Sequence, residues 1–210
     1  MIRCRATGLV YSNPQPHLRA VHAWHPSLVD LGNGRLLCTF DLGQAAESLD
    51  YATYASMSVD GGDTWCEPWP LLCQPDAQSR RSTHTIRVSR LASGKLLGMG
   101  ARFYRDDPSP GLTNRTTLGM TPMDVISVTS DDDGLTWSSP QRVEPPLVGP
   151  AFEVCHAPKT LRGGRCLFPT QTWPDWDTKA PQGMRAVAFV SNDQGETWPE
   201  YITVFDGRRR

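Results

Sequence analysis

Short apolar runs, separated by stretches rich in glycine, proline and asparagine, fill the chain, and this pattern predicts an all-β protein. The run R-L-L-C-T-F at residues 35–40 is typical of a strand buried between two layers. It follows Asn33-Gly34, a pair that readily adopts the positive φ of a two-residue hairpin turn. Ser93-Gly94 and Gly163-Gly164 hold the same place in two later segments, so three similar hairpins are expected.

An eight-residue pattern follows each hairpin. It reads S-V-D-G-G-D-T-W at residues 58–65, S-D-D-D-G-L-T-W at 130–137 and S-N-D-Q-G-E-T-W at 191–198. Ser, Asp, Gly, Thr and Trp keep the same offsets in all three copies, so these segments, here called the boxes, are an internal repeat. We expect each box to be a turn in which the Asp accepts backbone N–H groups, and the Trp to pack between repeats.

Each repeat contains four expected strands. The hairpin supplies two, a third leads into the box, and a short fourth follows the Trp. Trp65, Trp137 and Trp198 are separated by 72 and 61 residues. Four-stranded units at this period are typical of β-propeller blades, and we expect one partial propeller domain over residues 1–210. Its expected blades are listed by approximate range: 20–75, 80–148 and 150–206.

Composition and charge narrow the class of protein. Of the 210 residues 39% are hydrophobic and 20% charged, and the net charge of −1 argues against a nucleic-acid partner. No apolar run is long enough for a membrane helix, and the N-terminus lacks a secretory signal. A cytoplasmic location is expected for the chain as given, or an extracellular or periplasmic one if the true start lies upstream. The six cysteines have no C-x-x-C spacing, which favours reduced structural thiols over a disulfide framework.

The boxes resemble the Asp-box, or bacterial neuraminidase repeat, of the sialidase superfamily. The resemblance covers about residues 20–204 and implies a six-bladed propeller of which this chain holds about three blades. It also implies an exo-glycosidase that removes terminal sialic acid. No cofactor or metal is expected for this chain. A half-ring would leave two sheet faces uncovered. The chain is therefore expected to be a fragment of a longer gene product, or to close a ring as a homodimer.

Two features of the family are missing from this sequence. The arginine of the R-I-P motif, one of three that clamp the substrate carboxylate, is replaced in W-H-P by Trp24 and His25. The nucleophilic Tyr, its Glu partner and the other clamp arginines usually come from later blades. The resemblance to well-characterised sialidases is therefore weaker for the activity than for the fold.

Antiparallel strands place the start of strand one and the loop between strands two and three on one face of each blade. The loop of the first blade reads G-Q-A-A-E-S-L-D-Y and contains Glu47 and Asp50. In sialidases the general acid is an Asp of this loop, so Asp50 or Glu47 is the candidate catalytic acid. The alternative is that both are solvated loop carboxylates.

The same face is expected to gather further candidates. His25, His84 and His156 fall near strand one of successive blades and are expected to bind substrate or to carry protons. The alternatives are a metal site, whose geometry such long spacing does not define, and ordinary hydrogen-bonded histidines. The cationic candidates for an acidic sugar are Arg81, Arg87 and Arg102. The alternatives are that Arg87 points into strand packing and that Arg81 is an ordinary surface residue. Trp173 would stack on a sugar ring or anchor its own loop.

The sequence thus leaves three functions open. The first is a sialidase-like exo-glycoside hydrolase, or its N-terminal half, acting on a terminal sugar that can be acidic. The second is a non-catalytic propeller that binds glycan or protein. The third is a truncated product without a function of its own.

Overall fold

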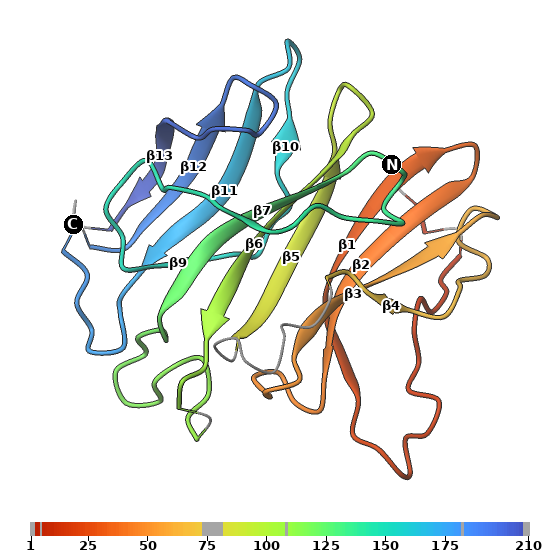
Figure 1. Ribbon diagram of the computed structural model, residues 1–210, viewed down its shortest axis with the longest axis horizontal. Helices are drawn as coiled ribbons and strands as arrows, with labels where there is room; N and C mark the ends of the chain where they lie inside the picture. Colours follow the sequence, from red (N-terminus) through yellow and green to blue (C-terminus); the bar gives the residue numbers. More distant parts are fainter. Residues whose placement is uncertain (1–2, 5, 73–81, 108, 182, 208–210) are drawn as a thin grey trace.

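The computed structural model consists of three antiparallel sheets side by side (Figure 1). It describes residues 3–4, 6–72, 83–107, 109–181 and 183–207, together with the backbone of Ser82. This part of the chain contains strands, turns and loops but no helix, hence none capable of crossing a membrane. An all-β fold of antiparallel sheets is therefore confirmed; two sheets have four strands and the third has five.

The three sheets follow one another along the chain. The strands of the first sheet are β1 (His22–Gly32), β2 (Arg35–Gly43), β3 (Ala52–Ser58) and β4 (Trp69–Pro70). Those of the second are β5 (Ser82–Arg90), β6 (Leu96–Tyr104), β7 (Met123–Ser130) and β8 (Gln141–Arg142). Those of the third are β9 (Ala151–Glu153), β10 (Lys159–Thr160), β11 (Cys166–Trp173), β12 (Arg185–Ser191) and β13 (Glu200–Asp206). We call these sheets blades A, B and C; neighbouring strands of each blade are consecutive in sequence, apart from β9.

The first strand of blade C is interrupted. Both β9 and β10 pair with β11, and residues 154–158 between them leave the sheet. Pro158 lies in this break and has no N–H group to donate to a ladder, which explains why pairing stops there. His156 therefore lies in an exposed loop between two strand pieces, rather than at the start of a continuous strand.

The hairpin turns differ from one another. Asn33 and Gly34 both have positive φ and form the expected two-residue turn between β1 and β2. In blade B the Leu91 amide donates to the Lys95 carbonyl, so the expected two-residue turn is in fact a three-residue loop. In blade C an equivalent bond joins the Leu161 amide to the Arg165 carbonyl. In blade B the longer loop is explained by Ser93. A two-residue turn would demand a left-handed φ at this position, which serine does not readily adopt.

The boxes are turns held by their own side chains, as expected. Asp60 accepts hydrogen bonds from the backbone amide and the hydroxyl of Thr64, at 2.9 and 2.6 Å, and from the Ser58 hydroxyl at 2.8 Å. These bonds lower the pKa of Asp60 to about 2 and keep it ionised. Asp132 and Asp193 accept the same bonds in blades B and C. The box carboxylates thus stabilise turns.

Two apolar cores lie between the blades. Leu37, Ile86 and Leu96 belong to the core shared by blades A and B, and all three are fully buried. Phe168 and Phe189 belong to the core between blades B and C, where their rings pack edge to face. Burial of side chains from neighbouring sheets is therefore what fixes the arrangement of the blades.

The two outer faces of the half-ring are not equivalent. On blade A, Cys38, Phe40 and Leu42 are covered by the segment before β1, in which Tyr11 stacks on Phe40 with ring centroids 5.8 Å apart. The expectation of two uncovered faces is therefore wrong for blade A. On blade C, β13 remains open, and Val204 is 71% exposed. Closure of a ring by a second copy would require the N-terminal segment to leave blade A.

Candidate functional site

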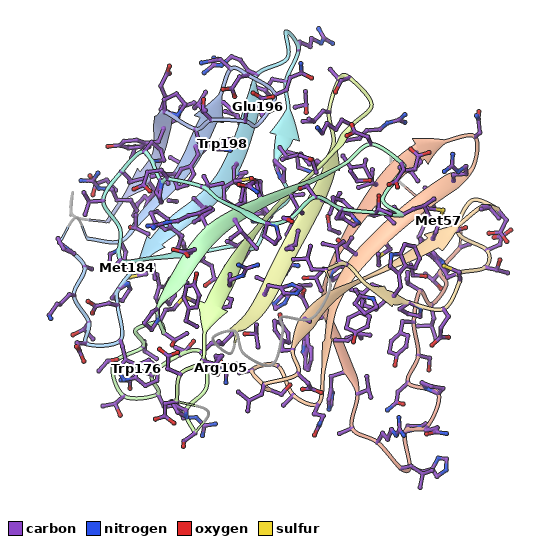
Figure 2. All side chains as sticks on the ribbon, viewed as in Figure 1. Met57, Arg105, Trp176, Met184, Glu196 and Trp198 are labelled. Atoms are coloured by element: carbon purple, nitrogen blue, oxygen red, sulfur yellow. The ribbon has the colours of Figure 1, made fainter. Side chains whose placement is uncertain are left out.

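The long loops of all three blades lie at one end of the molecule. Figure 1 shows the β2–β3, β6–β7 and β11–β12 connections at the bottom of the view and the β1–β2, β5–β6 and β10–β11 hairpins at the top. Figure 2 places Arg105 and Trp176 at the bottom, whereas Glu196 and Trp198 of the third box lie at the top. We call the bottom the loop end. Its irregular loops rest on a rigid sheet scaffold, which is where binding residues are commonly placed.

A buried carboxylate, Asp41, lies beneath the loop end between blades A and B. Its side chain is fully buried, and Oδ2 lies 3.0 Å from the Arg87 guanidinium, which is 2% exposed. Oδ2 also accepts from the Thr85 and Tyr51 hydroxyls at 2.7 and 3.0 Å. Oδ1 accepts from the Thr53 hydroxyl at 2.6 Å. Strands from two blades thus donate to one carboxylate, which satisfies a charge that burial alone would disfavour.

Asp41 is ionised in this network. Burial would raise its pKa, but the hydrogen bond from His25 and the charge of Arg87 outweigh that effect, so the pKa lies below its usual value. For Tyr51, burial and the neighbouring Asp41 carboxylate raise the pKa well above its usual value. The network therefore contains one negative charge, one positive charge and a neutral phenol.

His25 connects this network to the surface. Its Nδ1 lies 2.9 Å from the Tyr51 hydroxyl oxygen and 3.2 Å from Asp41 Oδ2, while half of its side chain (51%) stays exposed. His25 has a φ of 52° and lies in an irregularity of the β1–β2 ladder between Trp24 and Ser27. The bulge turns the imidazole back onto blade A.

His84 lies beneath the surface rather than on it. Its side chain is 5% exposed, and Nδ1 is 3.4 Å from the Thr53 amide. Burial lowers the pKa of His84 to about 4, which leaves the ring neutral at neutral pH. Arg102 is its Cα partner across the β5–β6 ladder and is half-buried. This position of His84 leaves little of its surface for a substrate.

The two candidate catalytic carboxylates occupy different environments. Asp50 is exposed and accepts from the Gln44 amide at 3.1 Å. Burial would raise its pKa, but the hydrogen bonds from Ser48 and Gln44 together outweigh that effect, so the pKa is lowered. Glu47 Oε2 accepts from the Leu112 amide of blade B at 2.8 Å. A general acid must hold its proton near neutral pH, which requires a raised pKa. The lowered pKa of Asp50 therefore suits an ionised carboxylate rather than a proton donor.

A cavity of about 810 Å³ separates the loops of blades A and B at the loop end. Glu47, Arg105 and Arg115 are among the residues that line it. Arg105 is 3% exposed; its Nη2 donates to the carbonyls of Glu47 and Pro110, and its buried Nη1 has no hydrogen-bond partner among the described residues. Cationic side chains beside a carboxylate give this cavity the chemistry to bind a polar, acidic ligand.

The remaining candidates lie apart from this network. His156 is exposed in blade C, beside a smaller pocket of about 290 Å³ that Cys155 and Glu153 also line. Trp173 donates from Nε1 to the Leu118 carbonyl at 2.7 Å, so it anchors the loop of blade B. Arg81 lies outside the described residues. Within the described part of the chain, no cluster of three or more His, Cys, Asp or Glu residues could hold a metal ion.

Comparison with known proteins assigns the fold. No family model matches the chain, and no curated protein matches it. Among solved structures, a Hadza microbial sialidase aligns over 85% of this chain with 24% identity and a TM-score of 0.67. The NanB sialidase of Streptococcus pneumoniae aligns over 93% of the chain with 15% identity and a TM-score of 0.63. A leech intramolecular trans-sialidase aligns over 97% with 12% identity and a TM-score of 0.65.

These similarities show that the chain adopts the β-propeller fold of sialidases. The alignments cover 36% of the Hadza enzyme and 46% of the other two, so the chain spans less than half of each. At these identities the similarity concerns the fold alone.

Sequence reasoning missed Asp41 and Tyr51. A signal for Asp41 was present, because a lone carboxylate inside the apolar strand R-L-L-C-T-F-D-L-G is rarely buried without a partner. Arg87 was a candidate for substrate contact, but it is 2% exposed and pairs with Asp41, so the alternative of strand packing holds for it.

Proposed function

We propose that the chain acts as, or as part of, a sialidase-like exo-glycoside hydrolase that removes a terminal sugar, with an acidic sugar preferred. The observation that carries this proposal is the cavity at the loop end, where Glu47 lies with Arg105 and Arg115 on a sialidase-type fold. A cavity of about 810 Å³ has the size of typical small-molecule sites.

The environments of the side chains suggest separate roles. Glu47 borders the cavity and is the better candidate to donate a proton to the glycosidic oxygen. Asp50, whose pKa is lowered, is proposed to stay ionised and to stabilise positive charge at the sugar ring. Arg115, which is exposed, is proposed to bind the carboxylate of an acidic sugar, and the buried Arg105 to add positive charge beneath it. These roles would replace the missing R-I-P arginine by cations from blade B.

Hydrolysis of chromogenic glycosides tests the proposal. The panel contains 4-nitrophenyl glycosides of N-acetylneuraminic acid, of uronic acids and of neutral sugars. We expect turnover of at least one acidic glycoside, and a loss of kcat/KM of about 100-fold or more when Glu47→Gln and Asp50→Asn are combined, since general acid catalysis typically contributes that much. Glu196→Gln, an exposed change at the opposite end, is the control and should leave kcat/KM unchanged.

The outcomes separate the candidate functions. A wild-type chain that binds glycans but hydrolyses none of the panel would favour the non-catalytic propeller and contradict the proposal. Turnover that survives the combined Glu47→Gln and Asp50→Asn change would leave a hydrolase whose catalytic carboxylates lie elsewhere.

A further inference from the structure

His25 is held in a conformation that its sequence position disfavours. Its φ of 52° lies in the left-handed region, which non-glycine residues rarely adopt. It also precedes Pro26, and a residue before proline prefers extended backbone. Surrounding contacts must therefore hold the bulge in place, and strained residues of this kind are concentrated at functional sites.

The contacts of His25 fix which ring nitrogen carries the proton. The Tyr51 hydroxyl has one proton, and it donates this proton to Asp41 Oδ2. Asp41 is a carboxylate and can only accept. Because Nδ1 of His25 lies 2.9 Å from the first oxygen and 3.2 Å from the second, Nδ1 must be the donor. In the neutral ring the lone pair is then on Nε2, the nitrogen turned away from the network.

The charges around His25 suit a group that takes up a proton. From β2 the ring faces Asp41, and the β2–β3 loop supplies Tyr51 directly after Asp50. From β5, Arg87 neutralises Asp41, and His84 lies buried close by. On its own strand, His22 stacks on Trp24. A proton bound at Nε2 would create an imidazolium whose Nδ1–H already points at a carboxylate, as in hydrolases with a His–Asp pair.

We propose that His25 is the general base of the loop end and that Asp41 and Tyr51 are its positioning residues. This role rests on the proposed glycosidase function and deepens it. Nε2 takes a proton from a water molecule as the water oxygen bonds to the anomeric carbon and the glycosidic C–O bond breaks. Glu47 gives its proton to the departing sugar oxygen, and the imidazolium returns the water proton to the Glu47 carboxylate through solvent. One water is consumed, the departing group leaves as an alcohol, and His25 returns to its neutral form.

Kinetics of His25→Asn test the proposal. Asparagine tolerates a positive φ, so the bulge should be kept, and an unchanged melting temperature checks this. We expect kcat to fall about 100-fold or more with KM changed less than about 3-fold, and the acidic limb of the pH–rate profile to disappear. Tyr51→Phe removes the hydroxyl beside Nδ1 and should shift that limb, whereas the exposed His17→Asn is the control and should change neither. A His25→Asn chain that keeps kcat and the acidic limb would overturn the role of His25 while leaving the glycosidase function intact.

Chemical modification provides a readout that does not depend on turnover. Diethyl pyrocarbonate reacts with a bare imidazole nitrogen, and mass spectrometry locates the product. We expect His25 to react several-fold faster than the exposed His17, and Tyr51→Phe to remove most of this difference. If no glycoside is hydrolysed, the proposed function fails, but the modification rate of His25 still shows whether its Nε2 is bare and reactive. A rate equal to or below that of His17 would overturn the role proposed for His25.

Discussion

Replacing Asp41 with alanine should lower the free energy of unfolding by about 3–5 kcal/mol, because the change leaves a buried arginine without its counter-charge. Arg87 is 2% exposed and its guanidinium lies 3.0 Å from Asp41 Oδ2. The hydroxyls of Thr53 and Thr85 would lose their shared acceptor as well. Urea unfolding at pH 7, followed by far-ultraviolet circular dichroism, measures the difference.

Two further variants make the Asp41 prediction specific. Asp177→Ala removes an exposed loop aspartate and should change the free energy of unfolding by less than about 0.5 kcal/mol. Combining Asp41→Leu with Arg87→Met removes both charges together and should restore most of the lost stability. A loss below about 1 kcal/mol in Asp41→Ala would contradict the central place given to this carboxylate.

His84 should make the protein sensitive to mild acid. Burial lowers its pKa to about 4 in the folded chain, against about 6.5 in an unfolded chain. Between these values the unfolded state binds more protons, so stability is fully present above about pH 6.5 and is lost as the pH falls towards 4. The expected loss is about 3 kcal/mol, since one pKa unit corresponds to about 1.4 kcal/mol.

The acid effect can be assigned to His84 by substitution. His84→Leu should flatten the dependence of unfolding free energy on pH between about 6.5 and 4, whereas His156→Gln, a change at an exposed histidine, should leave it as in the wild type. Parallel curves for wild type and His84→Leu would contradict the prediction.

Asp41 affects stability at a lower pH than His84 does. Its pKa is lowered in the folded chain, so its contribution to stability is present above about pH 4 and is lost as the pH falls through the folded pKa.

Much of the fold could be predicted because its signals are local. The box positions Ser58, Asp60 and Thr64 bond to one another within seven residues, and the same pattern recurs twice. Asn33-Gly34 likewise specifies its own turn. The break between β9 and β10 was not predicted, although Pro158 was visible, because the repeat suggested a continuous strand.

The covered face of blade A could not be predicted for a different reason. Val10 and Tyr11 end a run of only three apolar residues, in a segment without strand periodicity. Their partner Phe40 lies about thirty residues away, on the face of β2 opposite to that of Asp41. A sequence pattern carries no information about such a docking contact unless the packing of blade A is known first.

Only the part of the candidate site that lies within one loop could be predicted from the sequence. Glu47 and Asp50 belong to a single connection, so the sequence alone placed them together, and Glu47 borders the cavity, whereas their catalytic role stays a prediction. The Asp41 network instead joins β2, β3 and β5 with His25 of β1, so its members are separated by up to 62 residues. Only the stacking of two blades brings them together, which explains why His25 was identified without its partners.

The tautomer of His25 is the most direct test of the account. A long-range ¹H–¹⁵N correlation spectrum distinguishes protonated from bare imidazole nitrogens, and comparison with His25→Asn assigns the signals. We predict that neutral His25 carries its proton on Nδ1 and leaves Nε2 bare, and that this pattern is kept in Tyr51→Phe, where the Asp41 carboxylate still accepts from Nδ1. A neutral ring protonated on Nε2 would contradict it, because Nδ1 would then face the Asp41 carboxylate without a proton to share.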